Sequence, residues 1–378
     1  MNVARLLLRY RVVRPKLVQD APLALTEIHS RGTGTLKRPV VLKSLDEMFQ
    51  MTPSTSFSGR QLWNSTKLIR ENRNVRRSHG ACVVGSAAAV KRAWREYKIR
   101  PNVVYVPDTE PTVASWCLEE DLPTCVVRCS PAEINRRLLS AELCDGYAAE
   151  FPTPTAPLLE MFLGEGKPTR LASMLVMVGL RIPSNVGVLI RGAVDMGFES
   201  VLLIDCVDLF SEKVLRASGG TAFSPRIKVF EASGDAVSLL SSVATEHHLL
   251  PLLAVPSQMA EPAFEVAKRF HTSNAMRRAQ SNSREAPLHV GPLLVLGSEA
   301  QGLSALTGGW TIPYQYVSVP LPNSTIDSVN VGVAGSVLMH GFRPAAEKKF
   351  VELGEVQQAG EREGVAFPTV TPLVSVPQ

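Results

Sequence analysis

The sequence lacks three features that would each point to a particular class of protein. No run of eighteen or more apolar residues occurs in the 378-residue chain, so we expect no membrane-spanning helix. The six cysteines are scattered without a Cys-x-x-Cys pair, which argues against a zinc site and favours reduced thiols packed as small apolar side chains. The N-terminus also lacks acidic residues, because the first acidic residue of the chain is Asp20.

This acid-free N-terminus is basic and amphipathic. Its positive charges alternate with Leu, Val and Tyr and are Arg5, Arg9, Arg11, Arg14 and Lys16. That pattern is typical of an organelle transit peptide, whereas a secretory signal would need a longer uninterrupted apolar core. We therefore expect import into the mitochondrial matrix; a basic arm that stays on the protein and touches RNA is the alternative.

The overall composition allows a large folded body and a polyanionic partner. The chain is 45% hydrophobic and 20% charged, enough for one large core or two moderate ones. Its net charge of +5 is a mild basic bias that permits binding to nucleic acid without requiring it.

Two successive series of short apolar runs and amphipathic segments predict an α/β protein. The first predicts strands at 81–85, 102–106 and 125–129, and helices after Ser86, over 112–120 and after Ser130. The second predicts strands at 174–180, 200–205, 226–230, 249–255 and 292–297, with helices over 185–197 and 232–248. A mostly parallel sheet with helices on both faces is expected in this second part.

These patterns divide the chain into five parts. We expect a transit peptide and extension at 1–60, a small α/β domain at 61–152 and a proline-rich linker at 153–170. A larger α/β domain follows at 171–343, with a polar surface insertion at 271–287, and a flexible tail at 344–378.

Polar residues follow the strand expected at 174–180. Pro183 and Ser184 open a turn there, and a helix is expected from about Asn185. Backbone N–H groups at such a helix start can bind an anion. Arg191 can reach back toward them, because helical side chains lean toward the N-terminus. An ordinary helix cap with a solvated arginine is the alternative.

The strand at 292–297 runs directly into a loop bounded by Gly297 and Gly302. Glycines at the carboxyl end of a parallel strand let a ligand approach the backbone closely. Their spacing is not that of a dinucleotide-binding or Walker loop, so neither NAD nor ATP is predicted.

A third polar loop separates a strand that ends at Pro320 from a helix expected from about Ser328. The helix is rich in small residues, including Gly332, Ala334 and Gly335, which permit close backbone packing. Tight helix–sheet packing without a ligand is the alternative.

In this order, the three segments resemble the signature motifs of the SpoU/TrmH RNA ribose methyltransferases, a branch of the knotted SPOUT superfamily. The family motifs read N-x-G-x-x-x-R, then G-x-E-x-x-G-L-S, then I-P-M followed by S-L-N-V-S. The stretch from Arg216 to Phe223 also resembles the R-A-S-x-G-A-x-F sequence that members carry between the first two. The resemblance covers about 175–343, with Val329 in place of Leu, Gly332 in place of Ser and a third-motif loop one residue longer than usual.

The resemblance implies methylation of an RNA ribose 2′-hydroxyl with S-adenosylmethionine, in a SPOUT domain with a C-terminal trefoil knot. Periodicity alone gives only a plain doubly wound sheet. The implied catalytic residues are Asn185, Arg191, Glu299, Ser328 and Asn330. The implied cofactor-binding residues are Leu296, Gly297, Gly302, Val319, Pro320, Leu321 and Val329. Because arginine is almost never deprotonated, we expect Arg191 to orient the hydroxyl and stabilise the developing alkoxide rather than act as a base.

The first domain resembles the ribosomal-protein-like RNA-binding domain of the same family. The similarity rests on Gly80–Gly85 followed by a helix, although Val84 replaces a usual acidic residue. The basic residues expected to contact RNA phosphates are Arg73, Arg76, Arg77, Lys91, Arg92 and Arg95. A solvated basic face is the alternative.

The resemblance also implies partners. A dimer completes the family's site, either with a second copy or with a paralogue. The separate RNA-binding domain and the transit peptide favour large-subunit mitochondrial ribosomal RNA over transfer RNA, during ribosome assembly. The alternative is a catalytically weak or inactive RNA-binding assembly factor that kept the fold.

Overall fold

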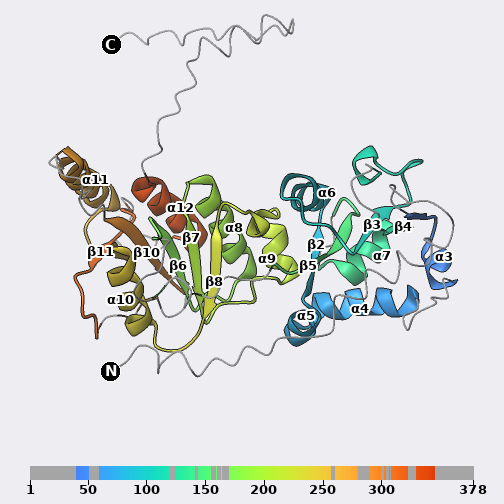
Figure 1. Cartoon of the computed structure of the whole chain (residues 1–378), viewed down its shortest axis with the longest axis horizontal. Coiled ribbons are helices and arrows are strands. Elements are labelled where there is room, and N and C mark those ends of the chain that lie inside the picture. The colour runs from blue at the N-terminus through green and yellow to red at the C-terminus, as the bar shows by residue number, and fades with distance from the viewer. Residues whose placement is uncertain are drawn as a thin grey trace, which may run out of the picture. The chain divides into compact units, whose positions relative to one another are not determined.

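The computed structural model contains two β-sheets (Figure 1). It describes residues 40–50, 59–118, 125–140, 144–154, 159, 163, 170–256, 260–279, 290–298, 302–303, 306, 308–321 and 329–344. The first 39 residues and those from 345 onward lie outside this range, and with them the predicted transit peptide and tail.

The first sheet has five strands in the order β1-β4-β3-β5-β2. The strands are β1 (Val40–Leu42), β2 (Ala81–Gly85), β3 (Val103–Pro107), β4 (Cys125–Cys129) and β5 (Ala148–Pro152). β4 pairs in parallel with β1 and β3, whereas β5 runs antiparallel to both β3 and β2. The helices of this half are α3 (Leu45–Gln50), α4 (Gly59–Glu71), α5 (Arg73–His79), α6 (Ala87–Lys91) and α7 (Pro131–Glu133).

The sequence predicted three of these five strands and the start of α7. Ser130 accepts a hydrogen bond from the Glu133 backbone N–H, as expected of a helix cap before proline. The helix predicted over 112–120 is wrong, since only a 3-10 turn at Ser115–Cys117 forms among its described residues. β1 and α3 lie inside the segment predicted as an extension, so the first domain begins at about residue 40 rather than 61. A three-residue strand is too short to leave a recognisable pattern.

The second sheet is parallel throughout its named strands, in the order β11-β9-β10-β6-β7-β8. The strands are β6 (Met174–Val178), β7 (Ser200–Ile204), β8 (Lys228–Ala232), β9 (Leu249–Ala254), β10 (Gly291–Gly297) and β11 (Gln315–Val317). The helices are α8 (Pro183–Asp195), α9 (Glu212–Ala217), α10 (Ala236–His247), α11 (Ala263–Ala279) and α12 (Val331–Phe342). The predicted α/β class and mostly parallel sheet are confirmed.

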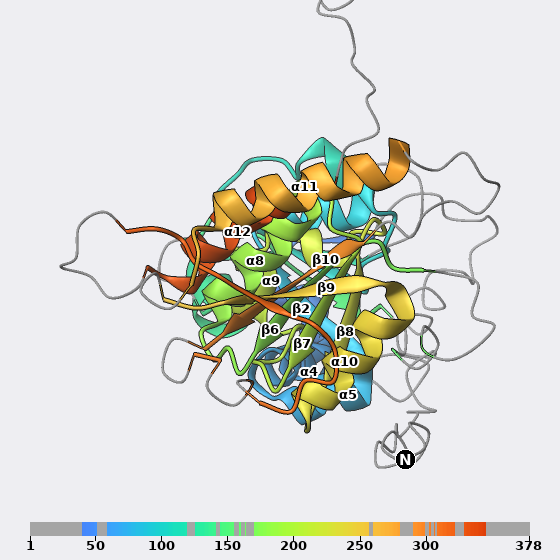
Figure 2. The same ribbon diagram turned by 90° about the vertical axis from the view of Figure 1, so that its left-hand side faces the viewer.

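Helices cover both faces of this sheet, as predicted (Figure 2). Alternate residues of each strand point to opposite faces, and on β6 Leu175 and Met177 join the core beneath α8, α11 and α12. Met174 and Val176 join the second core, beneath α10. The strands are therefore apolar on both sides, which is why they read as continuous hydrophobic runs.

Two predictions about connecting segments need correction. The polar segment 271–287 is helical over its first part, because α11 extends to Ala279; residues 280–289 lie outside the described range. The segment predicted as a linker buries Leu159 and Leu163 in the core beneath α10, so these residues are part of the second domain. The predicted knot stays a prediction, since 299–301 and 322–328 are not described.

The cysteines are free thiols that mostly lie in the core. All six cysteines are free, and every one except Cys144 is buried. Within the described ranges no group of three or more His, Cys, Asp or Glu side chains could hold a metal ion. None of the described helices combines the length and apolar character needed to cross a bilayer.

A buried carboxyl group lies in the first sheet. Glu150 accepts hydrogen bonds from the Thr66 hydroxyl at 2.7 Å and from the Asn102 amide at 2.9 Å. Burial nevertheless raises the pKa of Glu150, because these bonds only partly replace the lost hydration of the charge. The folded protein therefore binds this proton more tightly than the unfolded chain does, and ionisation of Glu150 opposes folding.

We expect Glu150→Gln to stabilise the protein increasingly as the pH rises. The glutamine keeps an acceptor for Asn102 and can donate to Thr66, whose hydroxyl also bonds the Leu62 carbonyl. Since an unfolded glutamate ionises near about pH 4, the Tm difference between variant and wild type should be small at pH 4 and larger at pH 8. A difference in Tm independent of pH would contradict the assignment.

Candidate functional site

Three of the predicted motifs leave the second sheet at the same edge. β6, β10 and β11 are parallel, so their carboxyl ends lie together. β6 and β10 are direct neighbours with Val178 opposite Gly297, although three strands and the helices α8 to α11 separate them in sequence. The chain order reverses at this pair, and ligands of open parallel sheets bind at such switch points.

The asparagines of the first and third motifs are in contact there. Asn185 is buried in the first turn of α8, and its side-chain oxygen accepts a 3.2 Å hydrogen bond from the Asn330 amide. Asn330 is the N-cap of α12, since its side-chain oxygen accepts from the Gly332 backbone N–H at 2.9 Å. Two predicted site residues that lie far apart in the sequence are thus joined, with their amides at the start of two adjacent helices.

Gly332 explains one departure from the family pattern. A β-carbon at this position would lie 3.0 Å from the Asn330 side-chain oxygen and 3.6 Å from that of Asn185. Glycine leaves this space free beside the asparagine pair, where the family usually has serine.

Glycines also set how closely the helices of the site approach one another. At Gly187 of α8, a β-carbon would lie 2.6 Å from the Val214 carbonyl oxygen on α9, a distance that real structures essentially never show. At Gly335 of α12, it would lie 2.3 Å from Leu189 and 2.7 Å from Leu296. Gly187 therefore lets the backbones of α8 and α9 come into direct contact, and Gly335 lets the backbone of α12 pack against side chains of α8 and β10.

The loop after β10 folds back on itself. The Gly302 backbone N–H donates to the Ser298 carbonyl at 2.8 Å, and Gly302 has a φ of +57°. A β-carbon on Gly297 would lie 2.2 Å from the Gly302 carbonyl oxygen, so the loop requires glycine at 297. At Gly302 the corresponding position has no atom of the described residues within 4 Å. Among the described residues, Gly302 is thus open on one side, as a ligand-binding loop needs.

The remaining predicted cofactor residues differ in exposure. Leu296 is buried at the end of β10, Val319, Leu321 and Val329 are half-buried, and Pro320 is exposed. Two of the five predicted catalytic residues, Glu299 and Ser328, lie outside the described residues, so their positions are not compared with the prediction.

Arg191 lies on α8 with about half of its side chain exposed. Its Nε atom is 3.8 Å from an Asp195 carboxylate oxygen, one turn further along the helix. One of its terminal nitrogens lies 3.8 Å from the place a β-carbon on Gly219 would occupy. In the described structure Arg191 therefore lies beside the loop after α9, which follows the α9 residues that pack against Gly187 of α8.

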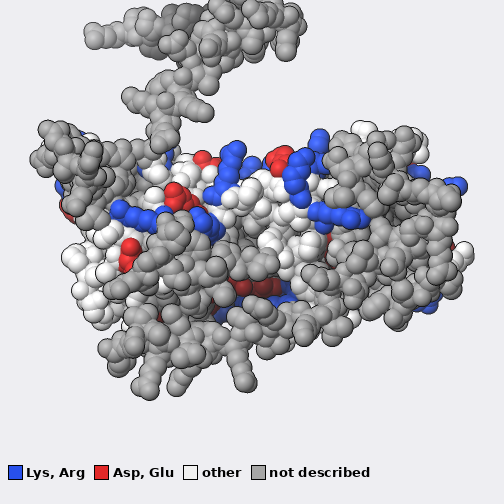
Figure 3. Space-filling view, in the orientation of Figure 1, with Lys and Arg blue, Asp and Glu red and all other residues white. Residues whose placement is uncertain are grey.

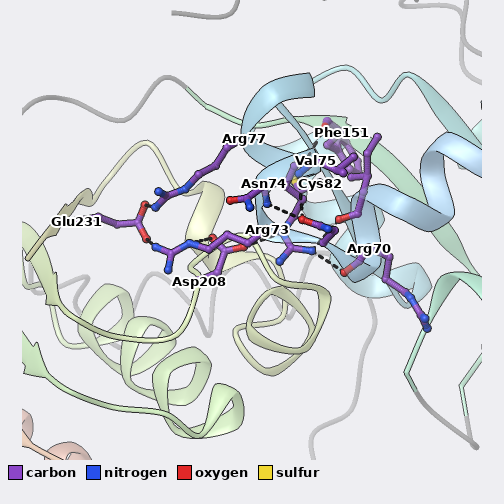
Figure 4. A network of polar contacts seen from close by, with 12 residues as sticks. Arg70, Arg73, Asn74, Val75, Arg77, Cys82, Phe151, Asp208 and Glu231 are labelled. Carbon is purple, nitrogen blue, oxygen red and sulfur yellow. Dashed lines mark hydrogen bonds and ion pairs between the residues drawn. The ribbon is translucent and has the colours of Figure 1, made fainter. Parts of the chain in front are cut away.

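Three of the arginines expected to bind RNA face acidic side chains of the second half of the chain, and Figure 4 shows Arg73 and Arg77 pointing to Glu231. Arg76 is buried, and its Nε donates to Asp208 at 2.7 Å. Arg73 lies 3.5 Å and Arg77 3.3 Å from the Glu231 carboxylate. Arg76 is therefore committed to an internal ion pair in this structure, while Arg73 and Arg77 are partly exposed at the same junction.

The other three basic residues lie on or next to α6. Lys91 is exposed. The guanidinium carbon of Arg95 lies 4.0 Å from the centre of the Trp94 ring, and the same side chain donates hydrogen bonds to the Trp116 carbonyl. Both contacts stabilise the domain to which Arg95 belongs. Arg92 donates to the Gly219 carbonyl of the second domain. On the face drawn in Figure 3, the Lys and Arg side chains that are visible lie in several separate groups.

The sequence did not predict the residues that receive these arginines. Asp208 follows β7 and Glu231 lies in β8, both in the second domain, and neither belongs to a sequence motif. Gly219 and Gly220 were visible only as part of the motif after Arg216, yet both have positive φ and contact α6. Two successive glycines after a helix were the available signal for a close backbone approach.

The second half of the chain is similar to known proteins. Residues 172–340 match the family model described as SpoU rRNA Methylase family. A protein from Synechocystis sp. described as an uncharacterized tRNA/rRNA methyltransferase is 27% identical over 175 residues, 45% of this chain. The match covers 52% of that relative, so it spans about half of its length.

Solved structures share the fold over most of the chain. The SpoU methyltransferase AviRb from Streptomyces viridochromogenes, in complex with AdoMet, aligns with a TM-score of 0.54 at 17% identity, covering 74% of this chain and 96% of that one. A structure described as an RNA 2′-O ribose methyltransferase aligns with a TM-score of 0.54 at 23% identity, covering 74% and 94%. These solved structures show a shared fold, and residues 172–340 are the part of the chain that matches the SpoU rRNA methylase family model.

Proposed function

We propose that this chain transfers a methyl group from S-adenosylmethionine to a ribose 2′-hydroxyl of RNA. The observation that carries the proposal is the contact between Asn185 and Asn330 at the carboxyl edge of the sheet. It brings polar groups of the first and third motifs together beside the loop that begins at Gly297. A SpoU family domain that keeps these residues supports an active enzyme over an inactive relative.

The chemistry requires a poor nucleophile to be activated. Bound S-adenosylmethionine would supply the methyl group from its sulfonium, and the ribose hydroxyl that accepts the methyl would lose its proton to water or phosphate. Arg191 orients the hydroxyl and stabilises the negative charge that develops on its oxygen. An arginine cannot serve as the base, because its guanidinium stays protonated. The asparagines donate and accept hydrogen bonds that position the ribose.

The loop between Gly297 and Gly302 fits the cofactor. Its backbone is held close by the contact of Gly297 with Gly302, and the open side of Gly302 gives a ligand access to main-chain N–H and C=O groups. The half-buried apolar residues Val319, Leu321 and Val329 add surface for an adenine ring.

We further propose a dimer, with a second copy or a paralogue. Large apolar side chains are exposed on the adjacent helices α8 and α12, where Val188 is 43%, Val333 56% and Val337 48% exposed. Exposed apolar residues gathered on neighbouring helices mark protein contacts. A dimer through this surface would place a second chain beside the asparagine pair.

The proposed substrate is large-subunit ribosomal RNA in mitochondria, acted on during ribosome assembly. It is favoured by the separate N-terminal domain and by the basic, acid-free sequence at 1–16. Ribose methylation analysis of mitochondrial ribosomal RNA from cells that lack the protein tests it: one missing 2′-O-methyl group is expected, and an unchanged pattern contradicts this substrate.

The cofactor is tested by calorimetric titration of S-adenosylmethionine into the purified protein. We expect saturable binding by the wild type and none by Gly297→Ala, since the added methyl group would overlap the Gly302 backbone. Gly308→Ala is the matched control, because the same change at 308 meets no atom of the described residues within 4 Å. It should bind like the wild type.

Light scattering of the same samples gives their oligomeric state. Loss of binding in Gly297→Ala alone supports the proposed pocket. A folded, dimeric wild-type protein that fails to bind the cofactor would refute the enzyme and favour the inactive assembly factor.

A further inference from the structure

The two halves of the chain meet at the glycine pair after α9. Gly219 and Gly220 have φ values of +58° and +80°. A β-carbon on Gly220 would lie 3.0 Å from the Ala89 carbonyl oxygen and 3.4 Å from its Cα. The backbone of α6, from the first domain, therefore packs directly against the second domain at this point, and only glycine leaves room for it.

Arg92 follows α6 at the start of a π-helical turn, Arg92–Glu96. Such turns are rare and frequently occur at functional sites. The start of α6 is fixed independently, because Ser86 adopts a positive φ of 78° and the Ala87 backbone N–H donates to Asp145 at 2.7 Å. The position of Arg92 relative to Gly219 thus follows from several constraints on α6, not from its own hydrogen bond alone.

Two arginines from different domains converge at Gly219. Arg92 donates through one terminal nitrogen to the Gly219 carbonyl. The same nitrogen lies 3.1 Å from the place a β-carbon on Gly219 would occupy, and a terminal nitrogen of Arg191 lies 3.8 Å from that place. Two guanidinium groups therefore share the space over one glycine.

The acidic side chains beside these two arginines neutralise their positive charge only weakly. Glu96 is 3.6 Å from Arg92 and Asp195 is 3.8 Å from Arg191, and both acids are more than half exposed. Exposed pairs at such distances contribute little. Two guanidinium groups held close together leave a net positive charge that favours an anion between them.

We propose that Arg92 and Arg191 together bind one RNA backbone phosphate, the 3′-phosphate of the nucleotide to be methylated. This inference rests on the proposed function, which gives Arg191 the neighbouring 2′-hydroxyl. The 2′-hydroxyl and the 3′-phosphate sit on adjacent ribose carbons, so a group that contacts one lies close to the other. Guanidinium groups pair with phosphate through two parallel hydrogen bonds, which fixes orientation as well as affinity.

The first domain thereby acts as a positioning element for the site in the same chain. A phosphate held by Arg92 would align the ribose only while α6 is docked on Gly220. Arg92 is a positioning residue in this scheme, and Arg191 contacts the reacting group.

The test measures the affinity of fluorescently labelled oligouridylate, a single-stranded RNA, over a range of salt concentrations. Each phosphate that a protein neutralises contributes about 0.7 to the slope of log affinity against log salt for single strands. We expect Arg92→Ala to weaken binding by about 10- to 100-fold and to lower the slope by about 0.7. Lys43→Ala removes an equal charge from an exposed site in the same domain and should change neither.

Two further variants separate phosphate binding from a structural role. Arg92→Gln retains a donor for the Gly219 carbonyl but has no charge, so it should dock α6 and still show the lower slope. Arg92→Ala combined with Arg191→Ala should lower the slope by about 0.7 in total, not twice that, because both residues serve one phosphate.

The proposal would be overturned if Arg92→Gln bound RNA with the affinity and the salt slope of the wild type. It would also be overturned if the two substitutions of the double variant lowered the slope additively. The RNA-binding measurement does not depend on methyl transfer. If Arg92 variants behave as expected while the wild type fails to methylate RNA, the phosphate site stands and the proposed activity fails.

Discussion

Replacing Arg191 with alanine should lower the rate of methyl transfer to RNA by about 100- to 1000-fold, the usual cost of removing one group that stabilises developing negative charge. The change should leave the fold intact, because the side chain is about half exposed on a helix and alanine is the best helix former. Cofactor affinity should also be unchanged, since the proposed contacts of Arg191 are with the RNA. The measurement is the single-turnover rate with ribosomal RNA, beside a calorimetric titration of S-adenosylmethionine.

Arg191→Lys distinguishes charge from geometry. Lysine keeps the positive charge but lacks the planar pair of donors, so it should recover only part of the rate. Asp195→Ala is the control, because it removes the exposed partner of Arg191 without touching the guanidinium. A normal rate in Arg191→Ala would remove this residue from the mechanism.

The sequence predicted the second half of the chain well because its strands are buried on both faces and its motifs lie at strand ends. Continuous apolar runs and a helix start at Asn185 are local signals, and local reasoning reads them correctly. The resemblance then placed Asn185 and Asn330 in one site, and the structure brings them to 3.2 Å. Periodicity alone could not do so, since the strand order that makes β6 and β10 neighbours is a long-range property.

The directions of the basic side chains in the first half could not be predicted from the sequence, for a physical reason. Basic residues in a sequence indicate charge but not direction, and Arg76 points into the protein because Asp208 lies there. That carboxylate is 132 residues away, and no local pattern links the two. Lys91 lies on the surface as expected of an RNA-binding residue, whereas Arg95 binds a backbone carbonyl of its own domain.

This buried ion pair should dominate the coupling between the two halves. Arg76 is 5% and Asp208 7% exposed, and besides Asp208 the arginine also donates to the carbonyl oxygens of Ile69 and Arg70 at 2.7 and 2.5 Å. Arg76→Ala would leave the Asp208 carboxylate buried. The Nε atom of Arg73, 3.9 Å from an Asp208 carboxylate oxygen, would then be the cationic group beside it in the described structure. Removing one member of a buried pair costs about 3–5 kcal/mol, since the other charge remains without compensation.

The expected result is a loss of about 3–5 kcal/mol in the free energy of unfolding for Arg76→Ala, measured by urea denaturation. Arg77→Ala is the matched control, since its pair with Glu231 is more than half exposed on the arginine side and should contribute less than about 1 kcal/mol. The double variant Arg76→Met with Asp208→Leu replaces both charges with apolar groups of similar volume. It should be more stable than Arg76→Ala, because no unpaired charge stays buried. Equal losses in Arg76→Ala and Arg77→Ala would mean that burial of the pair has no role in holding the halves together.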